Sequence, residues 1–187
     1  MSKNSKKWGV ICDIFIALNI IVTLVIIASA VYIFGFNKLE VKKYYRYQQI
    51  NVPEMKYTLT KDEVRKLVAD LYNTPHIYKE VDVIAKNRMA ESFILLRLVR
   101  IRKDLDIGDY AVAYAHELAH VKYMIGDETN VSFKSFVMLY ESGNAELQNM
   151  ALREAKYIIK GSYKGTKYDC GYYIIEYLKE KGVIYGR

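Results

Sequence analysis

Two histidines and a glutamate stand at the spacing of a zinc site, in the segment His116-Glu117-Leu118-Ala119-His120. Histidines four residues apart lie on one face of a helix, one turn from each other, where both imidazoles can reach a single ion. Neutral imidazoles suit Zn²⁺, which lowers the pKa of a water molecule and polarises a carbonyl group. Glu117 projects from nearly the same face and is the candidate general base and then general acid. The pattern predicts that the protein hydrolyses peptide bonds and that this segment forms its active site.

The residues around this segment favour a helix that is buried on its other side. Apolar packing would come from Val112, Ala113, Val121 and Ile125. The chain has only three histidines, and two of them stand here. The alternative interpretation is an ordinary helix on which two histidines happen to flank a glutamate.

A catalytic zinc usually takes three protein ligands and one water, so a third ligand must come from elsewhere. No histidine follows His120, and Cys170 is distant in sequence, which leaves Glu128, Glu141 and Asp127 as the acidic candidates. A helical hairpin after the metal-binding helix would bring Glu128 back against the metal. Glu141 becomes the ligand if the second helix crosses deeply, and Asp127 is more simply an N-cap. We predict Glu128 as the third ligand and keep Glu141 as the alternative.

The chain resembles the zincins, specifically the gluzincin type, in which a downstream Glu completes the zinc site. A closer likeness is to bacterial membrane-anchored, zincin-like proteins catalogued as a domain of unknown function. The resemblance is carried by residues 58–63, 116–120, 127–130 and 168–173. It implies Glu128 as the third zinc ligand and Asn130 as a group that supports the ligands from behind. Asp127 is a second candidate for that supporting position.

An almost wholly apolar run covers residues 10–36, with Asp13 as its only charged side chain. About 20 apolar residues span the hydrocarbon core of a bilayer, so we expect an uncleaved transmembrane anchor here, after a short basic N-terminus at 1–9. The alternative is a signal peptide with its cleavage site at the small residues 28–30. The basic N-terminus favours a single-pass protein of the cell membrane with its domain outside the cytoplasm, while the basic residues after the run favour the opposite.

The net charge of +7 is concentrated around that apolar run. Residues 1–50 carry seven Lys or Arg and two Asp or Glu, whereas residues 51–187 carry 21 and 19. The excess positive charge therefore lies where lipid headgroups would be, and no recognised nucleic-acid-binding module accompanies it. We expect the lipid bilayer and a peptide or protein substrate near the membrane as partners, and no nucleic acid.

Apolar residues at helical spacing predict helices over 60–72, 109–125, 128–140, 145–159 and 168–181. The first of these helices opens on a capping box at residues 60–63. Residues 92–99 are ambiguous, because periodicity does not separate a buried strand from a basic amphipathic helix. The expected fold is mainly α, with α+β possible. A juxtamembrane connector at 37–59 leads to a compact zincin-like helical domain at 60–187 with at most a small sheet.

Two further sets of side chains have both a functional and a structural interpretation. The first set is a group of tyrosines that could include an oxyanion donor or could pack in the core: Tyr168, Tyr172 and Tyr173. The second set is a group of basic residues that could bind anionic lipid or a substrate carboxylate, or could form a solvated face: Arg97, Arg100, Arg102 and Lys103. His76 is predicted to be a loop residue.

The main functional hypothesis is a membrane-anchored zinc metalloendopeptidase of the HExxH type. One alternative is a regulatory peptidase that cleaves a single partner protein. The other is a non-catalytic membrane protein with a structural zinc site, which a fourth protein ligand closing the metal would favour.

Overall fold

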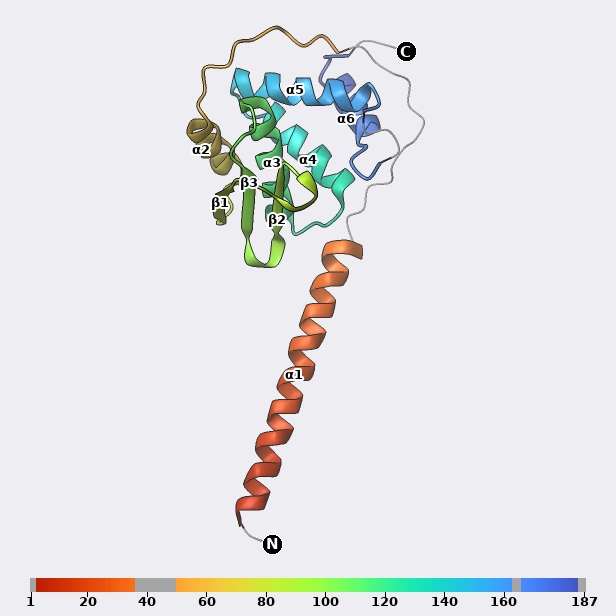
Figure 1. Cartoon of the computed structure of the whole chain (residues 1–187). Helices are drawn as coiled ribbons and strands as arrows, with labels where there is room; N and C mark the ends of the chain where they lie inside the picture. Colours follow the sequence, from red (N-terminus) through yellow and green to blue (C-terminus); the bar gives the residue numbers. More distant parts are fainter. Residues whose placement is uncertain (1–2, 36–49, 163–165, 185–187) are drawn as a thin grey trace.

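The computed structural model describes residues 3–35, 50–162 and 166–184. Over these residues the chain is mainly helical with a small three-stranded sheet, which confirms the expected fold class at that level. Figure 1 shows a packed domain formed by the elements after residue 50, together with the separate long helix α1 (Lys3–Gly35).

Helix α1 covers most of the segment in which the sequence predicts a transmembrane anchor, residues 10–36. Its side chains are described over 15–31, where apolar residues such as Phe15, Leu24 and Val31 are more than half exposed. No helix in the part of the chain that the structure describes is long and apolar enough to cross a membrane. The transmembrane anchor is therefore not confirmed, and the connector at 37–59 lies largely outside the described residues.

Helix α2 (Lys61–Tyr72) begins and ends as the sequence predicts. The Thr60 side chain accepts a hydrogen bond from the Glu63 backbone N–H, and the Glu63 carboxylate accepts one from the Thr60 N–H at 2.8 Å. This capping box satisfies donors that the first helical turn leaves without partners. Asn73 then takes a left-handed conformation and ends the helix, and Val64, Val68 and Tyr72 bury one face of it.

A sheet follows, with strand order β1-β3-β2. Its strands are β1 (Ile77–Val81), β2 (Ala90–Phe93) and β3 (Leu98–Arg102), with the short 3-10 helices η1 (Ala85–Asn87) and η2 (Ile94–Leu96) between them. β1 runs parallel to β3, and β2 runs antiparallel to it. Residues 92–99 are thus neither one strand nor one helix, because Arg97 adopts a left-handed conformation and turns the chain between β2 and β3.

Four helices complete the domain: α3 (Ile107–Tyr123), α4 (Glu128–Tyr140), α5 (Ala145–Ile159) and α6 (Gly171–Glu180). The N-caps of the first three are Asp106, Asp127 and Asn144, each accepting a backbone N–H in the first turn. α3 therefore starts earlier than the predicted residue 109, directly after its N-cap Asp106. The last helix starts at residue 171 instead of 168.

Helix α3 runs through the centre of the domain. Ala111, Ala115, Leu118 and Ala119 on this helix are fully buried. It packs against α2 and the sheet on one side and against α4 and α5 on the other, as Figure 1 shows. Small alanine side chains let the neighbouring elements approach closely, so α3 is held between them and can keep its functional residues in place.

Candidate metal centre

The turn between α3 and α4 brings the predicted ligands together. α3 ends at Met124, whose left-handed conformation reverses the chain, and α4 begins directly after the N-cap Asp127. Glu128, the first residue of α4, therefore lies back against the last turns of α3, as a helical hairpin requires. The predicted role of Asp127 as an N-cap is confirmed by the 2.9 Å bond from the Asn130 backbone N–H to its carboxylate.

Three ligand atoms converge on one point. The Nε2 atoms of His116 and His120 lie 3.0 Å and 3.2 Å from the same carboxylate oxygen, Oε2 of Glu128. One ligand atom from each residue lies within 4.8 Å of the others, and the two imidazole ring centroids are 4.9 Å apart. Two imidazole nitrogens and one carboxylate oxygen form a donor set that suits Zn²⁺. The residues present fit the metal that the sequence predicts.

The other ring nitrogens of the two histidines are held by the protein. Nδ1 of His120 lies 2.6 Å from the backbone carbonyl oxygen of Ile125, to which it donates, so in the neutral ring Nε2 is the nitrogen whose lone pair a metal could take. Nδ1 of His116 lies 3.4 Å from the hydroxyl of Ser132 on α4. These contacts fix the orientation of both rings, and for His120 the tautomer as well, so that Nε2 is the nitrogen available to a metal.

The electrostatics of the centre keep its carboxylate ionised. Burial raises the pKa of Glu128, but hydrogen bonds from His116, His120 and Lys167 outweigh it and hold the pKa well below its ordinary value of 4.5. Burial lowers the pKa of His120, yet the hydrogen bond with Glu128 and the charge of Glu117 raise it above 6.5 overall. Both shifts have the close contact between the imidazoles and the Glu128 carboxylate among their causes.

Lys167 is part of this centre and has no signal in the sequence. Its Nζ lies 2.8 Å from Oε1 of Glu128, so the ammonium occupies one carboxylate oxygen and leaves Oε2 facing the histidines. The backbone carbonyl of Lys167 accepts a hydrogen bond of 2.8 Å from the Thr129 hydroxyl, which ties this segment to α4. Tyr168, one of the predicted oxyanion candidates, follows directly, and its ring centroid lies 6.1 Å from that of His116.

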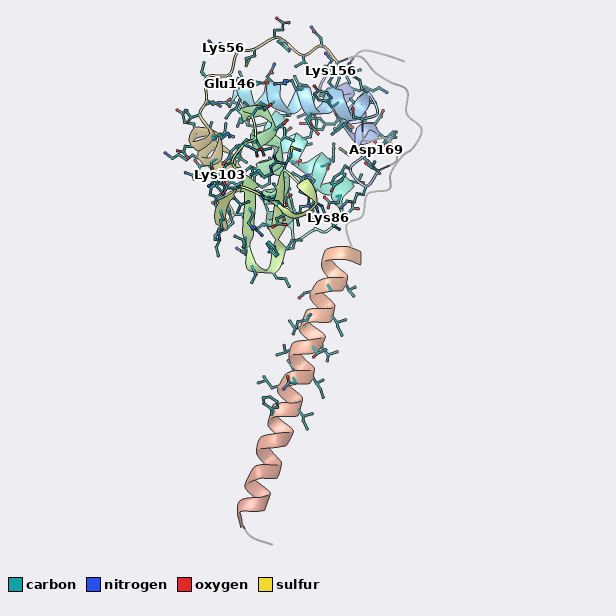
Figure 2. The ribbon with its side chains drawn as sticks, in the orientation of Figure 1. Lys56, Lys86, Lys103, Glu146, Lys156 and Asp169 are labelled. Atoms are coloured by element: carbon teal, nitrogen blue, oxygen red, sulfur yellow. The ribbon has the colours of Figure 1, made fainter. Side chains whose placement is uncertain are left out.

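A cavity of about 610 Å³ opens beside the three ligands. Its walls come from the loop before β2, from β2 itself, and from α3, α4 and α5, and Glu117 and Tyr168 are among the residues that line it. Figure 2 shows Lys86, on η1 before β2, at the opposite end of the domain from Glu146 and Lys156 on α5. The cavity places a carboxylate, Glu117, next to the metal ligands without making it part of the ligand set.

Glu141, the alternative third ligand, lies elsewhere. Its carboxylate accepts hydrogen bonds of 2.6 Å from the Tyr177 hydroxyl and from the Lys181 ammonium, which belong to the C-terminal helix and its cap. The structure does not bring Glu141 to the two histidines, because it lies thirteen residues beyond Glu128, at the C-cap of α4. Asn130, the predicted supporting group, is buried on the first turn of α4.

The other side chains singled out by the sequence form ion pairs or pack against neighbouring rings. Among the arginines, Arg100 pairs with Glu91 at 2.6 Å, and Arg102 pairs with Asp104. The ring of Tyr173 packs against Phe133. Of the predicted oxyanion candidates, Tyr168 lines the cavity beside the three metal ligands.

His76 is more than a loop residue. Its Nε2 and the Tyr114 hydroxyl share a hydrogen bond of 2.7 Å, and its Nδ1 lies 2.8 Å from the Thr74 carbonyl oxygen. It therefore ties the segment before β1 to α3. Cys170, the remaining sulfur candidate, is fully buried and precedes α6.

Comparisons of this chain with protein-family models, with curated proteins and with solved structures gave no match. The resemblance to zincins therefore stays a prediction from the sequence, and the function is inferred from the geometry of the site.

Proposed function

We propose that this protein is a zinc-dependent peptidase, in which His116, His120 and Glu128 hold the Zn²⁺ and Glu117 transfers protons. The observation that carries the proposal is the convergence of two Nε2 atoms and one carboxylate oxygen at the wall of a cavity. Three protein ligands leave a fourth position for water or substrate, as in catalytic rather than structural zinc sites. Among the described residues, the group that could hold a metal contains these three ligands and no fourth.

The chemistry divides between the metal and Glu117. When bound, Zn²⁺ acts as a Lewis acid that lowers the pKa of water and polarises the scissile carbonyl. The Glu117 carboxylate lines the same cavity from the position next to a ligand, where it accepts a proton from the attacking water and gives it to the leaving amine. Because Glu117 is not a metal ligand, it can gain and lose a proton during the reaction.

The cavity has a wall that suits an extended peptide. β2 is an edge strand, since β3 pairs with it on one side only and the sheet order ends there. Its residues Ala90 to Phe93 line the cavity, as do residues of α3. An edge strand presents backbone donors and acceptors that an added strand can pair with, so a substrate backbone can be held beside the metal ligands.

The test combines metal content with hydrolysis, on the full-length chain. We expect about one zinc per chain for the natural protein, and cleavage of some members of a mixed peptide library. Glu117→Gln should retain zinc and lose hydrolysis by about a hundredfold or more, since general acid–base catalysis contributes about that much. His116→Ala should lose the metal.

Two outcomes contradict the proposal. Zinc content unchanged by His116→Ala would place the metal elsewhere. Hydrolysis unchanged by Glu117→Gln, with the metal retained, would remove the proposed proton-transfer role and with it the peptidase assignment.

A further inference from the structure

The cavity contains a carboxyl group that the proposed chemistry does not use. Glu154 lies on α5 and lines the cavity together with Ala151 and Ile158 of the same helix. These positions are three and four residues apart, so the three side chains share one face of α5. The second half of α4 adds Phe136 and Leu139 to this wall. The α5 side of the cavity is thus an apolar surface with one carboxyl group on it.

The Glu154 carboxyl group has no partner within residues 50–162 and 166–184. It takes part in no hydrogen bond or ion pair there, although it is partly buried. The neighbouring Arg153 is directed elsewhere and donates to the Tyr57 hydroxyl at 3.2 Å. Burial, and then the negative charge of Asp109, raise the pKa of Glu154 to about 7. A carboxyl group in apolar surroundings without a partner is costly, and a cation brought to it would relieve that cost.

We propose that Glu154 selects substrates by receiving the ammonium or guanidinium group of a Lys or Arg side chain. The aliphatic stem of that side chain would lie along Phe136, Leu139, Ala151 and Ile158, and its charged end would meet the carboxylate. Lys and Arg are the side chains that combine a long apolar stem with a cationic end. The inference rests on the proposed function, because it assigns a specificity site to the same cavity.

Other side chains fit this wall less well. An aliphatic side chain of the same length would pack on the apolar residues but leave the carboxyl group without a partner. An acidic side chain would bring a second negative charge to Glu154, next to the charge of Asp109. A basic side chain satisfies the apolar wall and the carboxylate together, which predicts discrimination by charge at one substrate position.

The test measures peptide binding to the zinc-loaded full-length chain carrying Glu117→Gln, so that cleavage does not interfere. Fluorescently labelled octapeptides place Lys, norleucine or Glu at each position in turn, and anisotropy gives their affinities. At one position we expect Lys to bind about tenfold or more tightly than norleucine, as a charge-assisted hydrogen bond in a cavity allows. Adding Glu154→Gln should reduce this preference to about twofold or less and leave the norleucine peptide within about twofold.

The matched control is Asp109→Asn, which removes the α3 carboxylate whose charge acts on Glu154 and leaves the cavity wall unchanged; it should keep the preference for Lys. Equal affinities for Lys and norleucine at every position would overturn the inference, and if the natural protein still cleaves peptides, the proposed function stands. A Lys preference that survives Glu154→Gln would also overturn it. If no peptide binds to the zinc-loaded chain and none is cleaved, the proposed function fails, and the specificity site fails with it.

Discussion

His116 Nε2 and Glu128 Oε2 lie 3.0 Å apart, although the two residues are separated by twelve positions and belong to different helices. Two local features produce this contact. Met124 turns the chain at the end of α3, and Asp127 caps α4 at the point where the new helix begins. The distance is short enough for both atoms to face one metal ion, and it distinguishes Glu128 from the other downstream carboxylates.

The first prediction compares two glutamates of α4. Glu128→Gln removes a charged metal ligand and should weaken zinc binding by at least about a hundredfold, since a ligand contributes more than the tenfold to hundredfold of an outer-shell contact. Glu141→Gln should leave zinc affinity within about twofold, because Glu141 contacts Tyr177 and Lys181 instead. Competition titrations with a chromophoric chelator measure both affinities. If Glu141→Gln weakened zinc binding more than Glu128→Gln, the third ligand would be Glu141.

Part of this site could be predicted because its signals are local. The spacing of His116 and His120 specifies one helix face, and a turn followed by an N-cap residue specifies where Glu128 returns. Lys167 could not be predicted in this way. It reaches Glu128 across 39 positions, through the segment before α6, and no periodicity links the two.

The sheet and the cavity wall could not be predicted from the sequence, for a different reason. In residues 92–99 an apolar run contains the end of β2, the short helix η2 and the start of β3, so its hydrophobicity reflects three elements rather than one. Glu154 is a charged residue within an amphipathic helix, and such residues usually face solvent. Only the packing of α5 against α3 and α4 shows that it faces a cavity.

The second prediction concerns the pH dependence of the metal-free chain. The lowered pKa of Glu128 contributes stability that is present above its ordinary 4.5 and is lost as the pH falls through the folded value. The raised pKa of His120 contributes stability that is full below its ordinary 6.5 and is lost as the pH rises through the folded value. The centre should therefore stabilise the metal-free domain most between these two values.

Zinc should reverse the loss of stability that the metal-free domain shows as the pH rises. Metal binding needs neutral imidazoles, so the increase in Tm caused by zinc should grow as the pH rises from about 6 to about 8. Thermal unfolding with and without zinc across this range checks both statements, with His116→Ala as the variant that should show no zinc effect. A zinc-induced increase in Tm that does not change with pH would contradict the assignment of histidine ligands.

The third prediction uses two tyrosines that differ in hydrogen bonding. The Tyr72 hydroxyl is fully buried and has no hydrogen-bond partner in the described structure, and burial raises the pKa of this residue. Tyr72→Phe should leave the free energy of unfolding unchanged or raise it by about 1 kcal/mol, because it removes an unsatisfied polar group. Tyr114→Phe should lower it by about 1 kcal/mol, since that hydroxyl bonds His76 at 2.7 Å. Urea unfolding of the two variants measures the difference, and equal losses would contradict it.

The fourth prediction separates the stability role of Glu154 from its proposed role in binding. Burial, and then the charge of Asp109, raise the pKa of this carboxyl group from 4.5 to about 7. A raised carboxyl pKa means that the folded chain keeps a proton that the unfolded chain releases, so stability falls as the pH rises from 4.5 to about 7. Glu154→Gln has no such charge. The variant should match the natural protein at about pH 4.5 and exceed its free energy of unfolding by about 1 to 3 kcal/mol at pH 8.

Urea unfolding at the two pH values checks this, with Glu176→Gln as the control, because the Glu176 carboxyl is exposed on α6 and pairs with Lys179 at 3.1 Å. The control should show no gain at pH 8. A Glu154→Gln variant that is less stable than the natural protein at pH 8 would mean that the carboxylate has a stabilising partner in the folded chain. The cavity would then already hold a cation from the protein itself, and a substrate side chain would have to displace it.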